Sequence, residues 1–199
     1  MIKEYENVFT TEECQKIINE CFLNLKELTQ INPKTKEPYF YVRGTVLEKT
    51  NPKIDWALNR LASILNTKID NFEFPRFMKY TEGIEYTLHT DFFSPKQSSS
   101  AFHLKYGGQR IKSHLIYLND DFEGGFTEFP FWNITVKPKT GKMVSWTNVK
   151  EGIPLDNEES LDLDSQHRGT LVNKGIRYVL IVFERISVFT GETKQWLAR

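Results

Sequence analysis

From Asn71 onward, short runs of aromatic and β-branched residues alternate with clusters of Gly, Pro, Asn and Asp. This alternation is typical of all-β folds, because such residues favour strands and the clusters favour turns. The last run is the most apolar and is expected to form a central core strand. The expected strands are Arg76–Thr81, Ile84–His89, Lys112–Leu118, Thr127–Phe129, Lys142–Thr147, Gly169–Val172 and Arg177–Glu184.

The chain before Asn71 carries a helical pattern. After a short expected strand (about Ile2–Val8), Thr10 and Glu13 have the spacing of a capping box, which marks a helix start. Apolar residues then recur at helical spacing as far as Leu28, and a second helix is expected from about Ile54 to Asn66. Helices followed by many short strands favour a mainly β fold: a double-stranded β-helix (jelly roll, cupin-like) with the N-terminal helices packed outside.

The length of 199 residues fits a single domain. We expect helical support over about 1–70, a jelly-roll core over about 71–186 and a tail over 187–199. Two polar segments, Ser94–Ser100 and Lys150–Asp164, are expected to be exposed loops.

Charge and hydropathy exclude several partner classes. Lys+Arg and Asp+Glu both number 26, so no net charge favours nucleic acid or an anionic membrane. No apolar stretch approaches the about 20 residues of a membrane span, and the first residues lack a signal-peptide core, so a cytoplasmic location is expected. Cys14 and Cys21 would lie roughly 10 Å apart on one helix, which is too far for a disulfide. They are expected to be core thiols in a reducing compartment.

A metal site is suggested first by Leu88-His89-Thr90-Asp91. In an extended segment His89 and Asp91 point the same way and can approach one ion, although such a pair also arises by chance. His167, one of only 4 histidines, lies close before the apolar strand. Two histidines and one carboxylate form the facial triad of non-haem Fe(II) oxygenases, which leaves coordination positions open for a co-substrate and dioxygen.

Arg177 follows His167 by ten residues and opens the apolar run after the turn Asn173-Lys174-Gly175. A planar guanidinium binds a carboxylate through two parallel hydrogen bonds, so Arg177 could anchor an acidic co-substrate. A surface-facing arginine at a strand start is the alternative, and spacing alone does not decide between them.

Five ordered blocks of the chain resemble the prolyl 4-hydroxylase branch of the 2-oxoglutarate oxygenases. The resemblance covers most of the chain, and five blocks in order are far more specific than any one of them. The blocks are Tyr80–Asp91 (Tyr-x-x-Gly-x-x-Tyr-x-x-His-x-Asp), Gly107–Ile111 with Tyr117–Asp120, Gly124–Pro130 with Lys137–Gly141, Asp162-x-x-Ser165-x-His167, and Arg177.

The resemblance implies a metal site and a co-substrate site in a double-stranded β-helix. Iron would be held by His89, Asp91 and His167. Arg177 would hold the distal carboxylate of 2-oxoglutarate, helped by the hydroxyl groups of Tyr80 and Thr127.

The resemblance also implies a substrate side. Tyr86 would line the substrate pocket and Arg110 would contact a peptide. Tyr117 and Trp146 are further candidates, although Trp146 also fits a core residue. Phe126 stands where the family usually has Glu, which leaves this side less defined.

The implied reaction is hydroxylation of a prolyl residue in a peptide or protein, with O2 consumed and succinate and CO2 as co-products. Ascorbate is a candidate reductant. The same chemistry on a free amino acid or small molecule is an alternative, and so is a non-catalytic β-sandwich binding protein. The segments Asp91–Gly107 and Lys150–Asp164 flank the metal ligands in sequence and are expected to act as lids.

Other polar candidates are expected to be structural. His114 lies three residues before Tyr117, so it points to the opposite face of a strand if Tyr117 faces the pocket. His103 is expected to be solvated, with a contact to a lid as the alternative. The pairs Gly107-Gly108 and Gly124-Gly125 are expected to form turns rather than a phosphate-binding loop.

Overall fold

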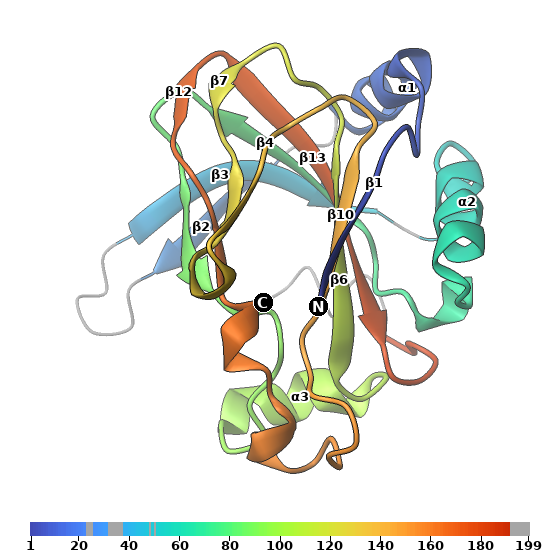
Figure 1. The fold of residues 1–199 in the computed structure, drawn as a ribbon. Helices are drawn as coiled ribbons and strands as arrows, with labels where there is room; N and C mark the ends of the chain where they lie inside the picture. Colours follow the sequence, from blue (N-terminus) through green and yellow to red (C-terminus); the bar gives the residue numbers. More distant parts are fainter. Residues whose placement is uncertain (23–25, 32–37, 48, 50, 192–199) are drawn as a thin grey trace.

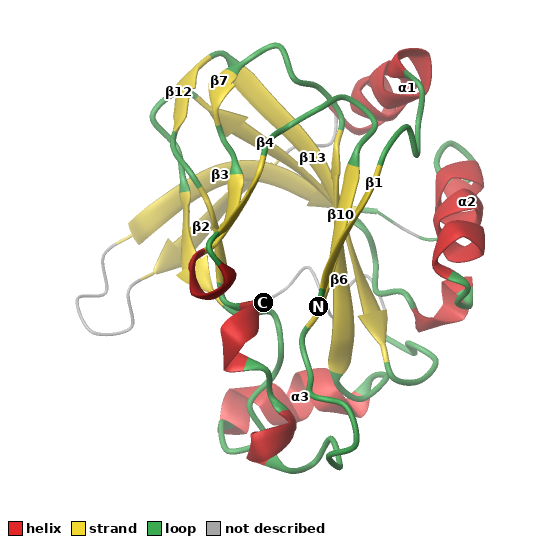
Figure 2. Cartoon of the chain, in the orientation of Figure 1, coloured by secondary structure: helices red, strands yellow, loops and turns green. Residues whose placement is uncertain are grey.

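The computed structural model describes residues 1–22, 26–31, 38–47, 49 and 51–191 (Figure 1). Strands dominate the described chain (Figure 2). The helices are α1 (Thr11–Phe22), α2 (Asp55–Leu65) and α3 (Ser98–Lys105). The strands are β1 (Ile2–Tyr5), β2 (Lys26–Ile31), β3 (Pro38–Val46), β4 (Arg76–Thr81), β5 (Tyr86–His89), β6 (Arg110–Tyr117), β7 (Glu123–Gly124), β8 (Thr127–Phe129), β9 (Ile134–Val136), β10 (Met143–Thr147), β11 (His167–Gly169), β12 (Val172–Lys174) and β13 (Ile176–Arg185).

The strands form two main sheets that pack against each other as a jelly roll. The larger sheet has the order β1-β10-β6-β13-β4-β3-β2, and the smaller has the order β5-β11-β8-β9. Strands β12 and β7 form a separate pair. Strand β13, the expected central strand, lies between β6 and β4. Every pairing is antiparallel, as expected for this fold class.

The two faces of the larger sheet have different partners, because side chains alternate along each strand. On β13, Leu180 and Val182 join the core cluster that contains the buried residues of α1 and α2. Val179, on the other face, joins a second cluster with Phe129 and Val136 of the smaller sheet. Helices α1 and α2 therefore cover the outside of the larger sheet (Figure 1), and its inner face is directed toward the smaller sheet.

The predicted start of α1 is confirmed, and its predicted end is wrong. Thr10 N donates to Glu13 Oε2 at 2.9 Å, and Glu13 N donates to Thr10 Oγ1 at 3.2 Å, as a capping box requires. The helix ends at Phe22, and Leu28 lies in β2, where it pairs with Val42 of β3. Because β3 also pairs with β4, sheet pairing overrides the local helical spacing.

Helix α3 was not predicted, because Ser94–Ser100 was expected to be a loop and α3 begins at Ser98. Its serine-rich sequence has weak helix propensity. Packing stabilises it instead: Phe102 and Tyr106 contact the buried pair Phe74 and Phe189. Helix α2 matches its predicted range closely. None of the helices described has the length and apolar character needed to cross a membrane.

The predicted strand Gly169–Val172 is in fact two strands. Strand β11 pairs with β5 and β8 in the smaller sheet, whereas β12 pairs with β7. Between them, Thr170 N donates to Phe126 O at 2.8 Å and Gly125 N donates to Leu171 O at 2.9 Å. The chain therefore changes sheets just after β11, and this places His167 rather than Gly169 at the start of the strand.

Candidate active site

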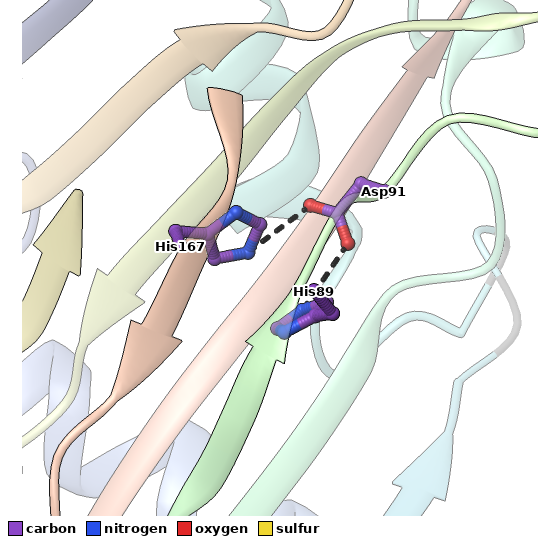
Figure 3. A group of neighbouring side chains, drawn as sticks. All are labelled: His89, Asp91 and His167. Carbon is purple, nitrogen blue, oxygen red and sulfur yellow. Dashed lines mark ion pairs between the residues drawn. The ribbon is translucent and has the colours of Figure 1, made fainter. Parts of the chain in front are cut away.

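Three predicted metal ligands meet between the two sheets. His89 ends β5, Asp91 lies two residues further on, and His167 begins β11. The two histidines are directly paired in the β5–β11 register. Each lies with Nε2 3.6 Å from a different carboxylate oxygen of Asp91 (Figure 3). The alternation of side chains along an extended segment predicts that His89 and Asp91 lie together. The pairing of β5 with β11 then brings His167 to them.

Backbone carbonyls orient both imidazole rings. His89 Nδ1 lies 2.8 Å from Thr87 O, and His167 Nδ1 lies 3.0 Å from Ser165 O. A carbonyl oxygen only accepts hydrogen bonds, so each Nδ1 carries a proton, and Nε2 is the ring nitrogen that faces Asp91 and could bind a metal. Histidines that bind a metal usually donate their other ring N–H to a carbonyl or carboxylate oxygen in this way.

Asp91 is held by a chain of buried hydrogen bonds. Ser113 Oγ donates to Asp91 Oδ2 at 2.7 Å, and Asn148 Nδ2 donates to Ser113 Oγ at 2.9 Å. Both Ser113 and Asn148 are fully buried. These contacts restrict rotation of the carboxylate, so both of its oxygens stay close to the histidines.

The pKa shifts of His89 and Asp91 suit a divalent cation, which needs neutral histidine and ionised carboxylate ligands. Burial, reinforced by the neighbouring His167, lowers the pKa of His89 to about 4. Burial by itself raises the pKa of Asp91, but attraction to His167, His89 and Arg110 outweighs it and the net pKa is lowered. One ligand atom from each of the three residues lies within 4.8 Å of the others, which fits one ion on one face of the cluster.

A second charged group, Arg177 of β13, lies in the same cavity. Its side chain is 2% exposed, and its guanidinium stacks over Tyr80 at 4.9 Å and donates from Nη2 to Thr127 Oγ1 at 3.3 Å. Among the residues described, no carboxylate pairs with it and its Nε has no hydrogen-bond partner. A buried cation without a counter-ion is costly unless an anion binds, so this end of the cavity suits a ligand carboxylate.

Gly169 makes room for that guanidinium. A Cβ atom at Gly169 would lie 2.8 Å from Arg177 Nη1, closer than real Cβ atoms approach. Tyr117 adds a further constraint, since its hydroxyl lies 2.5 Å from Thr127 Oγ1. Burial raises the pKa of both Tyr80 and Tyr117, so both phenols are neutral, and Tyr80, which lines the cavity, can donate a hydrogen bond to an anion there.

One cavity of about 540 Å³, its open mouth included, contains both features. It runs between the inner face of the larger sheet and the smaller sheet. Its lining residues are Arg76, Met78, Tyr80, Tyr86, His89, Asp91, Leu115, Thr127, Trp146, His167, Arg168, Gly169, Arg177, Ile181 and Phe183.

A family model identifies the superfamily of this chain. The model of the 2OG-Fe(II) oxygenase superfamily matches residues 75–185, which include the triad and Arg177. The chain belongs to this superfamily. The superfamily's metal and co-substrate, Fe(II) and 2-oxoglutarate, match the histidine–carboxylate cluster and the buried, uncompensated arginine of one cavity.

Relatives of the oxygenase include proteins named as prolyl 4-hydroxylases. A putative prolyl 4-hydroxylase of Acanthamoeba polyphaga mimivirus is 27% identical over 186 residues, covering 92% of this chain and 74% of the relative. Probable prolyl 4-hydroxylase 10 of Arabidopsis thaliana is 29% identical over 199 residues, covering 87% of this chain and 65% of the relative. The chain thus spans just under two thirds of the plant protein.

Solved structures support the jelly-roll fold. The viral collagen prolyl hydroxylase of Paramecium Bursaria Chlorella virus-1, in its 2OG complex, has a TM-score of 0.68 at 20% identity, covering 92% of this chain and 94% of that one. A Trichoplax adhaerens prolyl hydroxylase in complex with a hypoxia inducible factor peptide has a TM-score of 0.60 at 13% identity, covering 92% and 83%. The expected fold of the oxygenase is confirmed.

The predicted substrate contacts lie in different places. Tyr86 and Trp146 line the cavity, with ring centroids 4.2 Å from His89 and 4.5 Å from His167, respectively. Tyr117 is fully buried beside Thr127, at the Arg177 end. Arg110 is 7% exposed and does not belong to the lining residues described. Contact of these four residues with substrate stays a prediction.

Arg110 belongs to a buried ion-pair cluster behind the metal ligands. Its Nε and Nη2 donate to the two carboxylate oxygens of Glu73 at 2.5 and 2.8 Å, and its Nη1 donates to Asp91 O at 3.3 Å. Arg185 Nε lies 2.6 Å from the same carboxylate. The cluster therefore connects the backbone of Asp91, a predicted metal ligand, to the end of β13.

The two remaining histidines lie outside the triad. His114 is fully buried on the helix-covered face, with Nδ1 2.9 Å from Ser145 Oγ and Nε2 3.5 Å from Glu184 Oε2, so its structural role is supported. His103 is not solvated as predicted: it is half-buried in α3 and stacks on Phe93 with ring centroids 4.6 Å apart.

The two predicted lids touch, because Ser94 Oγ donates to the Glu158 carboxylate at 2.7 Å. Their movement as lids stays a prediction.

Several residues of the site were missed by sequence reasoning. Glu73, Ser113 and Asn148 sit behind the ligands, and no local pattern marks them. Arg76 could have been found, because it shares the alternation of Met78 and Tyr80 on a strand that was predicted correctly.

Proposed function

We propose that this oxygenase hydroxylates a C–H bond of a prolyl residue in a peptide or protein, converting 2-oxoglutarate and O2 to succinate and CO2. The observation that carries the proposal is one cavity that contains both the His89–Asp91–His167 cluster and the buried Arg177, which has no carboxylate partner among the described residues. The names of the relatives support the prolyl substrate.

Each residue of the cavity has a defined part in this reaction. His89, Asp91 and His167 would hold the iron, which together with 2-oxoglutarate and dioxygen supplies the oxidising chemistry when bound. Arg177 would bind the distal carboxylate through its guanidinium, with Thr127 beside it. Asp91 and Arg177 are both buried, so water is excluded from them. This exclusion strengthens their contacts and protects the reacting centre.

The wall around the metal ligands supports a cyclic apolar substrate group. Tyr86 lies against His89, and Trp146 lies against His167, so the ligands are flanked by flat aromatic surfaces on both sides. Met78 and Leu115 add further apolar surface from the larger sheet. A proline ring could pack between these aromatic groups with its C–H bonds directed at the metal.

A direct test combines metal binding, turnover and product mass. The protein is loaded with Fe(II) and 2-oxoglutarate without oxygen, then given air and proline-containing peptides. We expect succinate formation that requires both additions, and a mass increase of one oxygen atom on a prolyl residue. His167→Ala should abolish both, because it removes a ligand.

His114→Gln is the matched control. It removes an equally buried histidine from the opposite face of the sheet, so iron binding and turnover should persist even if stability falls. Oxygen transfer to free proline but not to peptides would favour the small-molecule alternative. Failure to bind Fe(II) and 2-oxoglutarate together would favour a non-catalytic binding protein.

A further inference from the structure

The cavity has an arginine at each end of its larger-sheet wall. Arg76 begins β4 and lines the cavity on the same face as Met78 and Tyr80. In the sheet register Arg76 pairs with Ile181, whereas Tyr80 pairs with Arg177. Arg76 lies four residue steps along β4 from Tyr80, the partner of the co-substrate anchor Arg177, which corresponds to roughly 13 Å.

Arg76 has no carboxylate to itself in the described part of the chain. It shares Glu73, whose Oε2 lies 3.9 Å from Arg76 Nη2, beyond hydrogen-bond distance. That carboxylate already receives Arg110 on both oxygens and Arg185 on one. Arg76 Nε is buried without a hydrogen-bond partner among the described residues. Three guanidinium groups thus surround one carboxylate, and Arg76 is the most distant and most weakly paired of them.

The third arginine that lines the cavity, Arg168, has a carboxylate partner. It forms a close ion pair with Glu128, whose Oε2 lies 2.7 Å from Arg168 Nε and 2.6 Å from Arg168 Nη2. Of the three arginines that line the described cavity, Arg168 is therefore neutralised within the protein and Arg177 is assigned to the co-substrate. Arg76 differs from both, because its one ion pair among the described residues is the 3.9 Å contact with a Glu73 carboxylate that two closer arginines share.

The position of Arg76 suits an incoming ligand. Its side chain is 32% exposed, so a ligand can reach it from solvent. Its guanidinium lies over the ring of Phe183 at 5.2 Å, and that contact limits its rotation. A guanidinium held this way presents parallel donors that match a carboxylate.

We propose that Arg76 binds a carboxylate of the substrate, at the end of the cavity remote from the 2-oxoglutarate anchor. The proposal rests on the proposed function for the reaction, but the preference for a carboxylate rests on Arg76 itself. The carboxylate belongs either to an acidic residue beside the target or to the free C-terminus of a short substrate. In both cases it would position the target residue over the metal ligands.

The test measures peptide binding by anaerobic calorimetry with the Fe(II)- and 2-oxoglutarate-loaded protein. Matched peptides carry Glu or Gln beside the target and a free or amidated C-terminus, which separates the two sources of carboxylate. We expect the wild-type protein to bind one acidic form about tenfold more tightly, the scale of one charge pair near a surface. The preference should weaken at high salt, because screening reduces it.

Variants assign the preference to one side chain. Arg76→Gln should remove it, and Arg76→Glu should reverse it in favour of peptides with Lys at the same position. Lys79→Gln is the matched control, because Lys79 has the same charge on the same strand but lies over Phe22, away from the cavity. Unchanged affinity for 2-oxoglutarate would show that the variants fold. Equal binding of acidic and neutral peptides, or a preference retained in Arg76→Gln, would overturn the proposal.

A parallel peptide set with Ala in place of Pro separates this proposal from the proposed function. Preference for acidic peptides without preference for proline would support the role of Arg76 and contradict prolyl hydroxylation. Preference for proline without preference for a carboxylate would do the reverse. If none of the peptides binds, both ideas are wrong.

Discussion

Glu73→Gln removes one negative charge from the buried cluster behind the metal ligands while keeping the side-chain volume. The Glu73 carboxylate is fully buried and receives Arg110 Nε and Nη2 at 2.5 and 2.8 Å and Arg185 Nε at 2.6 Å. The variant leaves two buried guanidinium groups without a counter-charge. Breaking a buried pair in this way costs about 3–5 kcal/mol, a large part of the about 5–15 kcal/mol that stabilises a typical protein.

Glu13→Gln is the matched control, because Glu13 makes the same two-bond contact with Arg60 at 2.6 and 2.7 Å. The Arg60 and Glu13 side chains are 40% and 26% exposed, so solvent screens the pair and its loss should cost about 0–1 kcal/mol. Glutamine also preserves the capping box. Each variant thus removes a carboxylate that accepts two short hydrogen bonds from one arginine, and the burial of that carboxylate is the main difference between them.

Urea unfolding of both variants, followed by circular dichroism without metal, gives the two free-energy losses. Iron affinity should also fall in Glu73→Gln alone, because Arg110 Nη1 donates to the backbone oxygen of Asp91. Similar losses of stability in the two variants would refute the argument that burial makes the Glu73 cluster essential.

Three further predictions concern pH, the co-substrate and the thiols. Burial alone raises the pKa of Glu73, but attraction to Arg110 and Arg185 outweighs burial and lowers the pKa from 4.5 to about 2. The ionised Glu73 therefore stabilises the fold fully above pH 4.5, and this stabilisation is lost as pH falls toward 2, so acid titrations of wild type and Glu73→Gln should differ in that window. Arg177→Ala should weaken 2-oxoglutarate binding by about 2–4 kcal/mol in anaerobic titrations, and unchanged affinity would place the anchor elsewhere. Burial raises the pKa of Cys14 to about 11 and of Cys21 to about 12, so alkylation followed by mass spectrometry should be slow in the native protein and fast in urea, and equal rates would contradict their burial.

Local sequence patterns were sufficient to predict the start of α1, the pair His89 and Asp91, and the central strand β13. The capping box set the start of α1, and alternation placed His89 and Asp91 on one side of an extended segment. The apolar run after Arg177 identified the central strand β13. Such features involve residues a few positions apart, and the geometry of a helix or strand fixes their relation.

Tertiary structure decided what depends on distant pairing. Leu28 lies in a strand because β2 pairs with β3 at the sheet edge, and α3 forms because Phe102 and Tyr106 have partners far along the chain. Glu73 has no local signal, yet two arginines from separate strands converge on it. Burial removes competition from water, so contacts between distant residues overrule local preference, and no short window of sequence contains both partners.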